Sequence, residues 1–215
     1  MATIVPAILT DDPAVFQAQL EEYKLFSRRV QIDASDGTFA PSTTVPLDNL
    51  QIPEGLNVDI HVMSARPSEH LSTIINLKPS LCIMHAEVDD NLTELINALH
   101  NAGIKAGLAL LKGTFPGKVK DLITSVDHVM IFAGDLGRQG GNIDMLQIEK
   151  APLIRTIKPD VEIGWDGGSN LSNVRALAHA GIDVINVGSA LSRAADKPAM
   201  YQSLVAESEK KGVLV

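Results

Sequence analysis

The chain has 215 residues, of which 45% are hydrophobic and 20% charged, and this length is enough for one large core. Its formal net charge of −8, with Lys and Arg scattered along the chain, argues against nucleic acid or an anionic membrane as the main partner. The N-terminus lacks a basic leader, no apolar stretch reaches the length of a membrane span, and the one cysteine excludes an internal disulfide. We therefore expect a soluble, cytoplasmic protein in which Cys82 is a buried structural thiol.

Short apolar runs alternate with helix-like segments along the whole sequence. Three of the intervening segments carry clear helical signals. In the first, Asp11 is the expected N-cap. The other two end at Gly103 and Gly181, in the position that favours a left-handed residue. The apolar runs predict strands at 3–9, 28–33, 56–63, 80–86, 105–111, 128–133, 161–166 and 183–188, and the three helices are expected within 11–26, 91–103 and 171–181.

Eight strand-then-helix units follow one another without a break in composition. Strands separated by helices predict parallel pairing through right-handed crossovers. At this length the pattern favours an α/β fold of the (β/α)8 or TIM-barrel type, with residues 1–215 as a single domain. A doubly wound open sheet is the alternative, but it usually has fewer strands, and no G-x-G-x-x-G motif follows the first strand.

The alternation of side chains along each strand predicts which residues face the barrel interior. In the second strand Val30 and Ile32 form the outward apolar set, so Asp33 points inward. The same reasoning turns His61 and Asp166 inward. All three stand at carboxyl ends of strands, where this fold places catalytic groups. A single Asp at a strand end often only caps a turn, and a single inward His is often a hydrogen-bonded core residue. Three such residues on three strands make a shared site the better interpretation.

Asp36 lies three residues after Asp33, has the opposite parity and precedes Gly37. Asp-Gly is a common turn signal. We therefore expect Asp36 to shape the turn and to take no part in chemistry.

Glycine-rich loops follow the last three strands, at 134–142, 166–170 and 187–191. Backbone N–H groups in such loops form an anion cradle, and in this fold a phosphate site commonly follows the seventh and eighth strands. Glycine also serves plain turns. Three such loops on adjacent strands nevertheless favour a small phosphorylated ligand.

The motifs QIDASDGTFAPSTT, VDIHVM, GRQGG, WDGGSN and VGSAL, in this order, resemble the ribulose-phosphate 3-epimerase family, which has a ribulose-phosphate-binding type of TIM barrel. The likeness covers nearly the whole chain. Such enzymes invert the carbon next to the ketone of a sugar phosphate. One aspartate removes a proton, another returns one to the opposite face, and a divalent metal stabilises the enediolate.

The resemblance implies roles for particular residues. Asp33 and Asp166 would be the catalytic acid/base pair, and the metal ligands would be Asp33, His61, Asp166 and the side chain of Gln31. The metal would be Zn, Fe, Mn or Co. Gly137 is an alternative phosphate contact, because the loop can be aligned with the family motif in two ways that differ by one residue. The substrate and its phosphate would be bound by Ala7, Met63, Gly137, Gly140, Gly141, Gly167, Gly168, Gly188 and Ser189.

The chain departs from the family pattern at several site positions. Gln31 stands where the family has a metal-binding His, and Ala7 stands where it has a substrate-contacting Ser. Gln offers only a neutral carbonyl oxygen, a poor ligand for Zn or Fe beside imidazole, so we expect the metal to be weakly bound or absent. Ser35 and Phe132 replace two methionines while Met63 remains, which leaves pentose and hexose phosphates both open.

Two functions follow from this pattern. The first is epimerisation of a ketose phosphate, because both acid/base aspartates and the phosphate loops are retained. The alternative is a catalytically impaired family member that binds a sugar phosphate as a regulatory or interaction protein. A different lyase or isomerase on the same barrel is a third, smaller option, because fold alone does not determine chemistry. The family's habit of self-association implies a homo-oligomer.

Overall fold

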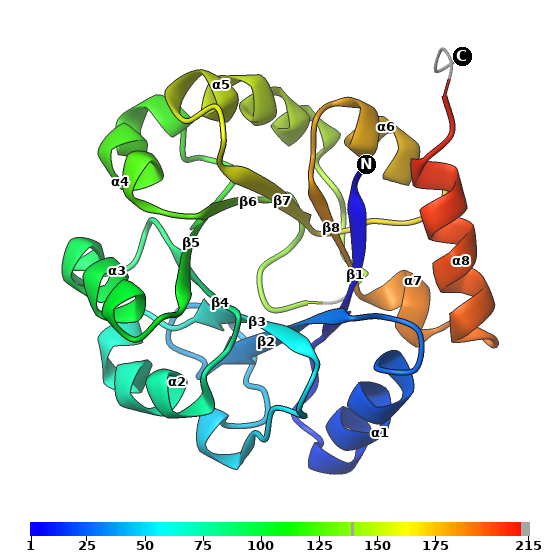
Figure 1. Ribbon diagram of the computed structural model, residues 1–215, viewed down its shortest axis with the longest axis horizontal. Coiled ribbons are helices and arrows are strands. Elements are labelled where there is room, and N and C mark those ends of the chain that lie inside the picture. Colours follow the sequence, from blue (N-terminus) through cyan, green and yellow to red (C-terminus); the bar gives the residue numbers. More distant parts are fainter. Residues whose placement is uncertain (139, 212–215) are drawn as a thin grey trace.

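The computed structural model describes residues 1–138 and 140–211, and in it eight parallel strands close into a barrel in sequence order, with β1 beside β8 (Figure 1). The expected (β/α)8 architecture is confirmed, and each strand begins and ends within two residues of its predicted bounds. The strands are β1 (Thr3–Ile8), β2 (Arg29–Ser35), β3 (Asn57–Met63), β4 (Leu81–His85), β5 (Lys105–Leu110), β6 (His128–Phe132), β7 (Glu162–Asp166) and β8 (Val184–Val187).

The helices surround the barrel as an outer layer (Figure 1). The second unit departs from the predicted pattern, because only a 3-10 turn at Leu47–Asn49 lies between β2 and β3. Prolines at positions 41, 46 and 53 explain this, since each lacks the N–H that a helix interior needs. The helices are α1 (Pro13–Tyr23), α2 (Leu71–Leu77), α3 (Leu92–Asn101), α4 (Lys120–Ser125), α5 (Lys150–Ile157), α6 (Val174–His179), α7 (Ser189–Ser192) and α8 (Lys197–Ser208).

Local signals explain where several helices begin and end. The N-cap of α1 is Asp12 and not the expected Asp11, and its carboxylate accepts hydrogen bonds from two backbone N–H groups of the first turn. The reason is Pro13, which occupies the first helical position and so makes the preceding residue the cap. The predicted ends of α3 and α6 are confirmed, with Gly103 at φ +74° and Gly181 at φ +88°.

Two apolar cores confirm the predicted alternation. The outward residues of the strands pack under the helices in one large cluster that includes Val30, Ile32 and Trp165. Inside the barrel a smaller cluster of Leu81, Ile83, Ala109, Met130 and Phe132 fills the side of β4, β5 and β6. Cys82 is fully buried in the outer cluster, and burial raises the pKa of its thiol to about 12, as suits a structural residue.

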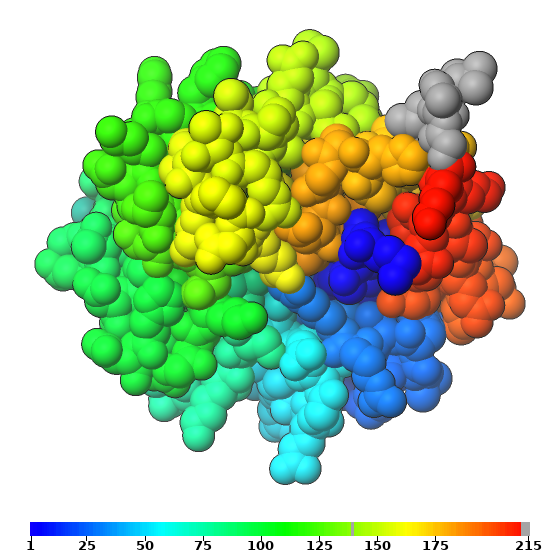
Figure 2. All heavy atoms as spheres, turned by 45° about the horizontal axis from the view of Figure 1, so that its top comes forward, coloured from blue at the N-terminus to red at the C-terminus, as the bar shows by residue number. Residues whose placement is uncertain are grey.

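The N-terminal residues lie against the last helix of the chain. Figure 2 shows them in dark blue between the orange segment around α6 and the red α8. The hydroxyl of Tyr201 in α8 donates a hydrogen bond to the carbonyl oxygen of Ile4 in β1, at 3.3 Å. The first strand is thus held by β8 on one side and by α8 from outside. In the described ranges no helix combines the length and apolarity needed to cross a membrane.

The amino end of the barrel interior holds a cluster of charged side chains from four strands. Arg29 of β2 donates hydrogen bonds to Asp59 of β3 at 2.7 Å and, through two nitrogens, to Glu162 of β7 at 2.8 Å. His128 of β6 contacts the same carboxylate at 2.8 Å. Burial alone would raise the pKa of Glu162, but the hydrogen bonds from Arg29 and His128 outweigh it and hold this pKa well below its usual value.

The pKa of Glu162 makes a prediction about acid stability. A carboxyl group whose pKa is lowered by folding stabilises the fold above its unfolded pKa and loses that contribution as pH falls. We expect Glu162→Gln to cost about 1 kcal/mol at pH 7, since part of the carboxylate is open to water, or roughly 2–4 °C in Tm. The difference in Tm between the two proteins should shrink as pH falls below about 4.5, the ordinary pKa. A Tm difference that stays constant from pH 7 to pH 3 would contradict this.

Candidate active site

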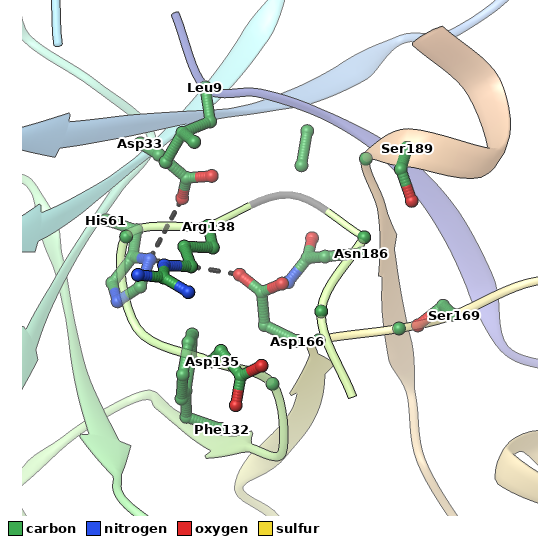
Figure 3. Close-up of a pocket in the computed structure, with 18 of the residues that line it drawn as sticks. Leu9, Asp33, His61, Phe132, Asp135, Arg138, Asp166, Ser169, Asn186 and Ser189 are labelled. Atoms are coloured by element: carbon green, nitrogen blue, oxygen red, sulfur yellow. Dashed lines mark hydrogen bonds and ion pairs between the residues drawn. The ribbon is translucent and has the colours of Figure 1, made fainter. Parts of the chain in front are cut away.

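Three ionisable side chains converge at the carboxyl end of the barrel. Asp33 and His61 come from the paired strands β2 and β3, and Asp166 ends β7 on the other side of the barrel. His61 Nδ1 lies 2.9 Å from Asp33 Oδ1 and 3.8 Å from Asp166 Oδ2, and Figure 3 shows the three groups pointing toward one another. Each offers one ligand atom within 4.8 Å of the other two, a spacing at which a divalent ion could be held.

Gln31 lies one layer below these groups and is fully buried. Its amide nitrogen donates hydrogen bonds to Asp33 Oδ1 at 2.9 Å and to Asp166 Oδ2 at 2.6 Å. For its oxygen to coordinate an ion among these carboxylates, the amide would have to rotate. Three ligand atoms, from Asp33, His61 and Asp166, could thus reach a divalent ion, but the group of Gln31 nearest to them is an N–H donor. The proposed ligation by Gln31 stays a prediction.

The two carboxylates differ in environment. Burial raises the pKa of Asp166 to about 6, and the nearby charge of Asp33 adds to this, while His61 and the amide of Gln31 act in the opposite direction. One carboxyl group that readily takes a proton beside another is the arrangement that acid/base chemistry needs.

His61 is oriented by the buried His85, which in turn faces the half-buried Glu87. Its Nε2 lies 2.8 Å from His85 Nε2, and His85 Nδ1 lies 3.6 Å from Glu87 Oε2. Burial lowers the pKa of His85 to about 4, so its imidazole is neutral at pH 7 and one nitrogen donates while the other accepts. The contact at Nε2 therefore determines whether His61 Nδ1 presents a proton or a lone pair to the carboxylates.

Replacing His85 by Leu is expected to lower the rate of the reaction that the site performs on the order of tenfold or more, because His61 loses the partner that orients it. Gln in the same place keeps a nitrogen donor near the end of the side chain and should restore part of the rate. The measurement is the solvent exchange assay described below, with Tm as a check on folding. Equal rates for the Leu and Gln variants would contradict an orienting hydrogen bond.

The cavity at this end of the barrel contains every predicted site residue except the buried Gln31. Glycines of the loops after β6, β7 and β8 line it, and Asp33 and Asp166 face one another across it (Figure 3). The roles of these residues stay predictions, but the structure brings them together. The predicted residues that line it are Ala7, Asp33, His61, Met63, Gly137, Gly140, Gly141, Asp166, Gly167, Gly168, Gly188 and Ser189.

The loops after β6 and β7 are in backbone contact beside Asp166. A Cβ on Gly167, which has φ +109°, would lie 2.1 Å from the backbone nitrogen of Gly134. The carbonyl oxygen of Gly168 accepts hydrogen bonds from Asn170 and Asn173, at 2.9 and 3.0 Å, within its own loop. These bonds orient the peptide units of the loop.

Asp36 shapes its turn, as expected. Its Oδ1 accepts hydrogen bonds from the backbone N–H and the hydroxyl of Thr38, at 2.9 and 2.6 Å, and Gly37 adopts φ +83°. Its Oδ2 lies 3.1 Å from His70 Nε2. Asp36 does not line the cavity described above.

Sequence reasoning missed several residues of the site. His85 could have been found by parity, because Leu81 and Ile83 in the same strand face the interior. Arg138 and Asn186 line the cavity, and in Figure 3 the side chain of Arg138 points into it from the loop after β6. No periodicity marks Arg138, because it lies in a loop.

The fold and the site define a class of protein, a TIM barrel with paired carboxylates among glycine-rich loops at its mouth. Residues 3–192 match the model of the ribulose-phosphate 3 epimerase family. The chain therefore belongs to the ribulose-phosphate 3-epimerase family, as a divergent member.

Curated relatives support this assignment. The chain is 27% identical over 210 residues to a ribulose-phosphate 3-epimerase of Helicobacter pylori, covering 94% of this chain and 95% of the relative. It is 28% identical over 211 residues to the cytoplasmic isoform of ribulose-phosphate 3-epimerase from Oryza sativa subsp. japonica, covering 94% and 92%. A solved structure of 3-hexulose-6-phosphate synthase superposes with a TM-score of 0.74 at 15% identity, covering 95% of this chain and 98% of the other, which shows the shared barrel fold.

Proposed function

We propose that this protein epimerises a ketose phosphate at the carbon next to the carbonyl group. The observation that carries this proposal is the position of Asp33 and Asp166 on strands from opposite sides of the barrel, both facing one cavity. Inversion at a carbon needs one group to remove a proton and a second group to return one to the other face. Membership of the family and the names of the relatives support the same reaction.

In the proposed reaction one carboxylate removes the proton while the other, in its acid form, is ready to protonate the opposite face. The pKa of Asp166, raised to about 6, favours this sharing of one proton between the pair. His61 and Gln31 hold Asp33 in position through hydrogen bonds at 2.9 Å each. Asp33, His61 and Asp166 are the groups that could reach a divalent ion, and Zn, Fe, Mn or Co, if bound there, would supply electrostatic stabilisation of the enediolate.

The glycine-rich loops would hold the phosphate of the sugar. Supporting this, Gly167 and Gly168 follow Asp166 directly, so a phosphate bound there would place the sugar over the carboxylates. The residues assigned to the phosphate are Gly140, Gly141, Gly167, Gly168, Gly188 and Ser189, with Gly137 as the alternative.

Hydrogen exchange tests the proposal without requiring a known product. Ribulose 5-phosphate and a hexulose phosphate would be incubated with the protein in D2O, with EDTA or with Mn, Zn, Fe or Co, and exchange at the carbon next to the carbonyl followed by NMR. The expected result is exchange that the double variant Asp33→Asn/Asp166→Asn abolishes. Exchange that continues unchanged in the double variant would overturn the assignment of the two aspartates.

The second candidate is a sugar-phosphate-binding protein without catalytic activity. The replacements at Gln31 and Ala7 favour it, since both fall on positions where the family has polar site residues. The same assay separates the two functions. Measurable binding of sugar phosphate with no exchange under any metal condition would favour the binding protein.

A further inference from the structure

The orientation of the Gln31 amide is the starting point. Both hydrogens of its nitrogen are used, one on Asp33 Oδ1 and one on Asp166 Oδ2. Its carbonyl oxygen is buried and has no hydrogen-bond partner among the described residues. A rotation of the amide by 180° would exchange its nitrogen and oxygen. The oxygen would then lie against the two carboxylate oxygens at the same short distances, with no hydrogen between them. The surrounding charges therefore favour the observed orientation.

A hydrogen-bond donor at the position of the Gln31 amide offsets the repulsion between the two carboxylates. Asp33 and Asp166 are both largely buried, and one oxygen of each lies within 4.8 Å of the other, so the two carboxylates repel each other strongly at low dielectric. A divalent cation between them would remove that repulsion. The amide of Gln31 does the same in part, because charge-assisted hydrogen bonds to one nitrogen attract both carboxylates to it. The Nδ1 nitrogen of His61 lies at the same oxygen of Asp33 and can add a third donor.

The same geometry works against a tightly bound ion. Three ligand atoms, one each from Asp33, His61 and Asp166, would be available, but the Gln31 group nearest to them is an N–H donor. A cation placed among the carboxylates would meet a partial positive charge on that side, and ligation by Gln31 would leave both carboxylates without its hydrogen bonds. Each effect lowers the affinity for a metal.

We propose that Gln31 is a positioning residue that takes the structural place of a bridging cation, so that this site assembles its two carboxylates without a divalent ion. The proposal builds on the proposed acid/base roles of Asp33 and Asp166. Its physical basis is the neutral, fully buried amide of Gln31, which lies below Asp33 and Asp166 and donates a hydrogen bond to each. It predicts that the metal requirement of the site depends on this one side chain.

Substitutions of the same size can reverse the effect. Gln31→Glu keeps the shape but replaces the donor by a third carboxylate, and Gln31→His supplies an imidazole ligand. Gln31→Met keeps the length and offers neither a donor nor a hard ligand. Gln202→Glu on the exposed face of α8 is the matched control, because it changes the net charge equally and lies outside the cavity.

The primary measurements are Mn²⁺ affinity by calorimetry and Tm in EDTA and in excess Mn²⁺, neither of which needs turnover. The wild-type protein and Gln202→Glu should bind Mn²⁺ weakly and show the same Tm in both conditions. Gln31→Glu and Gln31→His should bind Mn²⁺ at least tenfold more tightly, and their Tm should rise when the ion is added. If one variant does not fold, the other still supports the comparison.

The proposal is overturned if the wild-type protein binds Mn²⁺ as tightly as these variants, or if EDTA lowers its Tm by several degrees. The exchange assay adds a separate result: the wild-type rate should persist in EDTA and should fall at least tenfold in Gln31→Met. A wild-type protein that exchanges no sugar phosphate would overturn the proposed function, whereas the affinity and Tm measurements would still decide the role of Gln31.

Discussion

Replacing Asp166 by Asn is expected to lower the rate of the proposed epimerisation by roughly 10²- to 10⁴-fold, the usual contribution of a positioned acid or base. The variant should fold, because Asn keeps an oxygen that can accept the hydrogen bond from Gln31, which lies 2.6 Å from Asp166 Oδ2. Asp33 remains able to remove a proton from one face. One epimer should therefore still exchange its proton with D2O without inversion, and the opposite epimer should exchange in Asp33→Asn.

The control is Asp36→Asn, the same substitution in the turn that follows β2. Asp36 is hydrogen-bonded to Thr38 and lies outside the cavity, so its variant should keep the wild-type rate. Product and exchange are read in the same NMR spectra. Inversion by Asp166→Asn at more than a tenth of the wild-type rate would contradict the two-carboxylate mechanism.

Replacing Gly167 by Ala is expected to cost about 3 kcal/mol or more, because it combines backbone strain with overpacking. Gly167 has φ +109°, and a Cβ there would meet the nitrogen and Cα of Gly134 at 2.1 and 2.5 Å. Both are backbone atoms, so no side chain can rotate away. A loss of this size corresponds to roughly 6–12 °C in Tm for a domain of this length.

The same variant should lose affinity for phosphate, because the loops after β6 and β7 must separate to admit the methyl group. Gly113→Ala is the matched control, since a Cβ at Gly113 would meet no heavy atom within 4 Å. Thermal unfolding gives the stability, and calorimetry with a sugar phosphate gives the affinity. A Gly167→Ala variant as stable as Gly113→Ala would show that the contact between the loops can relax.

The sequence was sufficient to predict the barrel and the convergence of Asp33, His61 and Asp166 at one end of it. The alternation of side chains predicted their directions because outward residues such as Val30 and Ile32 pack under the helices. Polar residues on the other face of the strand, such as Asp33, therefore point into the barrel interior. The carboxyl ends of parallel strands meet at one mouth, so strand position alone brought Asp33, His61 and Asp166 together.

The features that could not be predicted depend on side-chain direction and on long-range partners. Period-2 alternation places Gln31 inside the barrel, but it does not say whether the nitrogen or the oxygen faces the carboxylates. The answer depends on charges from a strand 135 residues further along the chain. The same holds for Arg29, whose contact with Glu162 spans 133 residues. Such partners become visible only when the strands are assembled.

The charged cluster of Arg29, Asp59, Glu162 and His128 has a consequence for how this protein can evolve. It connects β2 and β3 to β6 and β7 at the amino end of the barrel, opposite to the end that holds the cavity. The residues that hold the barrel closed at this end are thus separate from those of the candidate active site. We therefore expect substitutions of residues that line the cavity to leave the contacts that hold β2 and β3 to β6 and β7 intact.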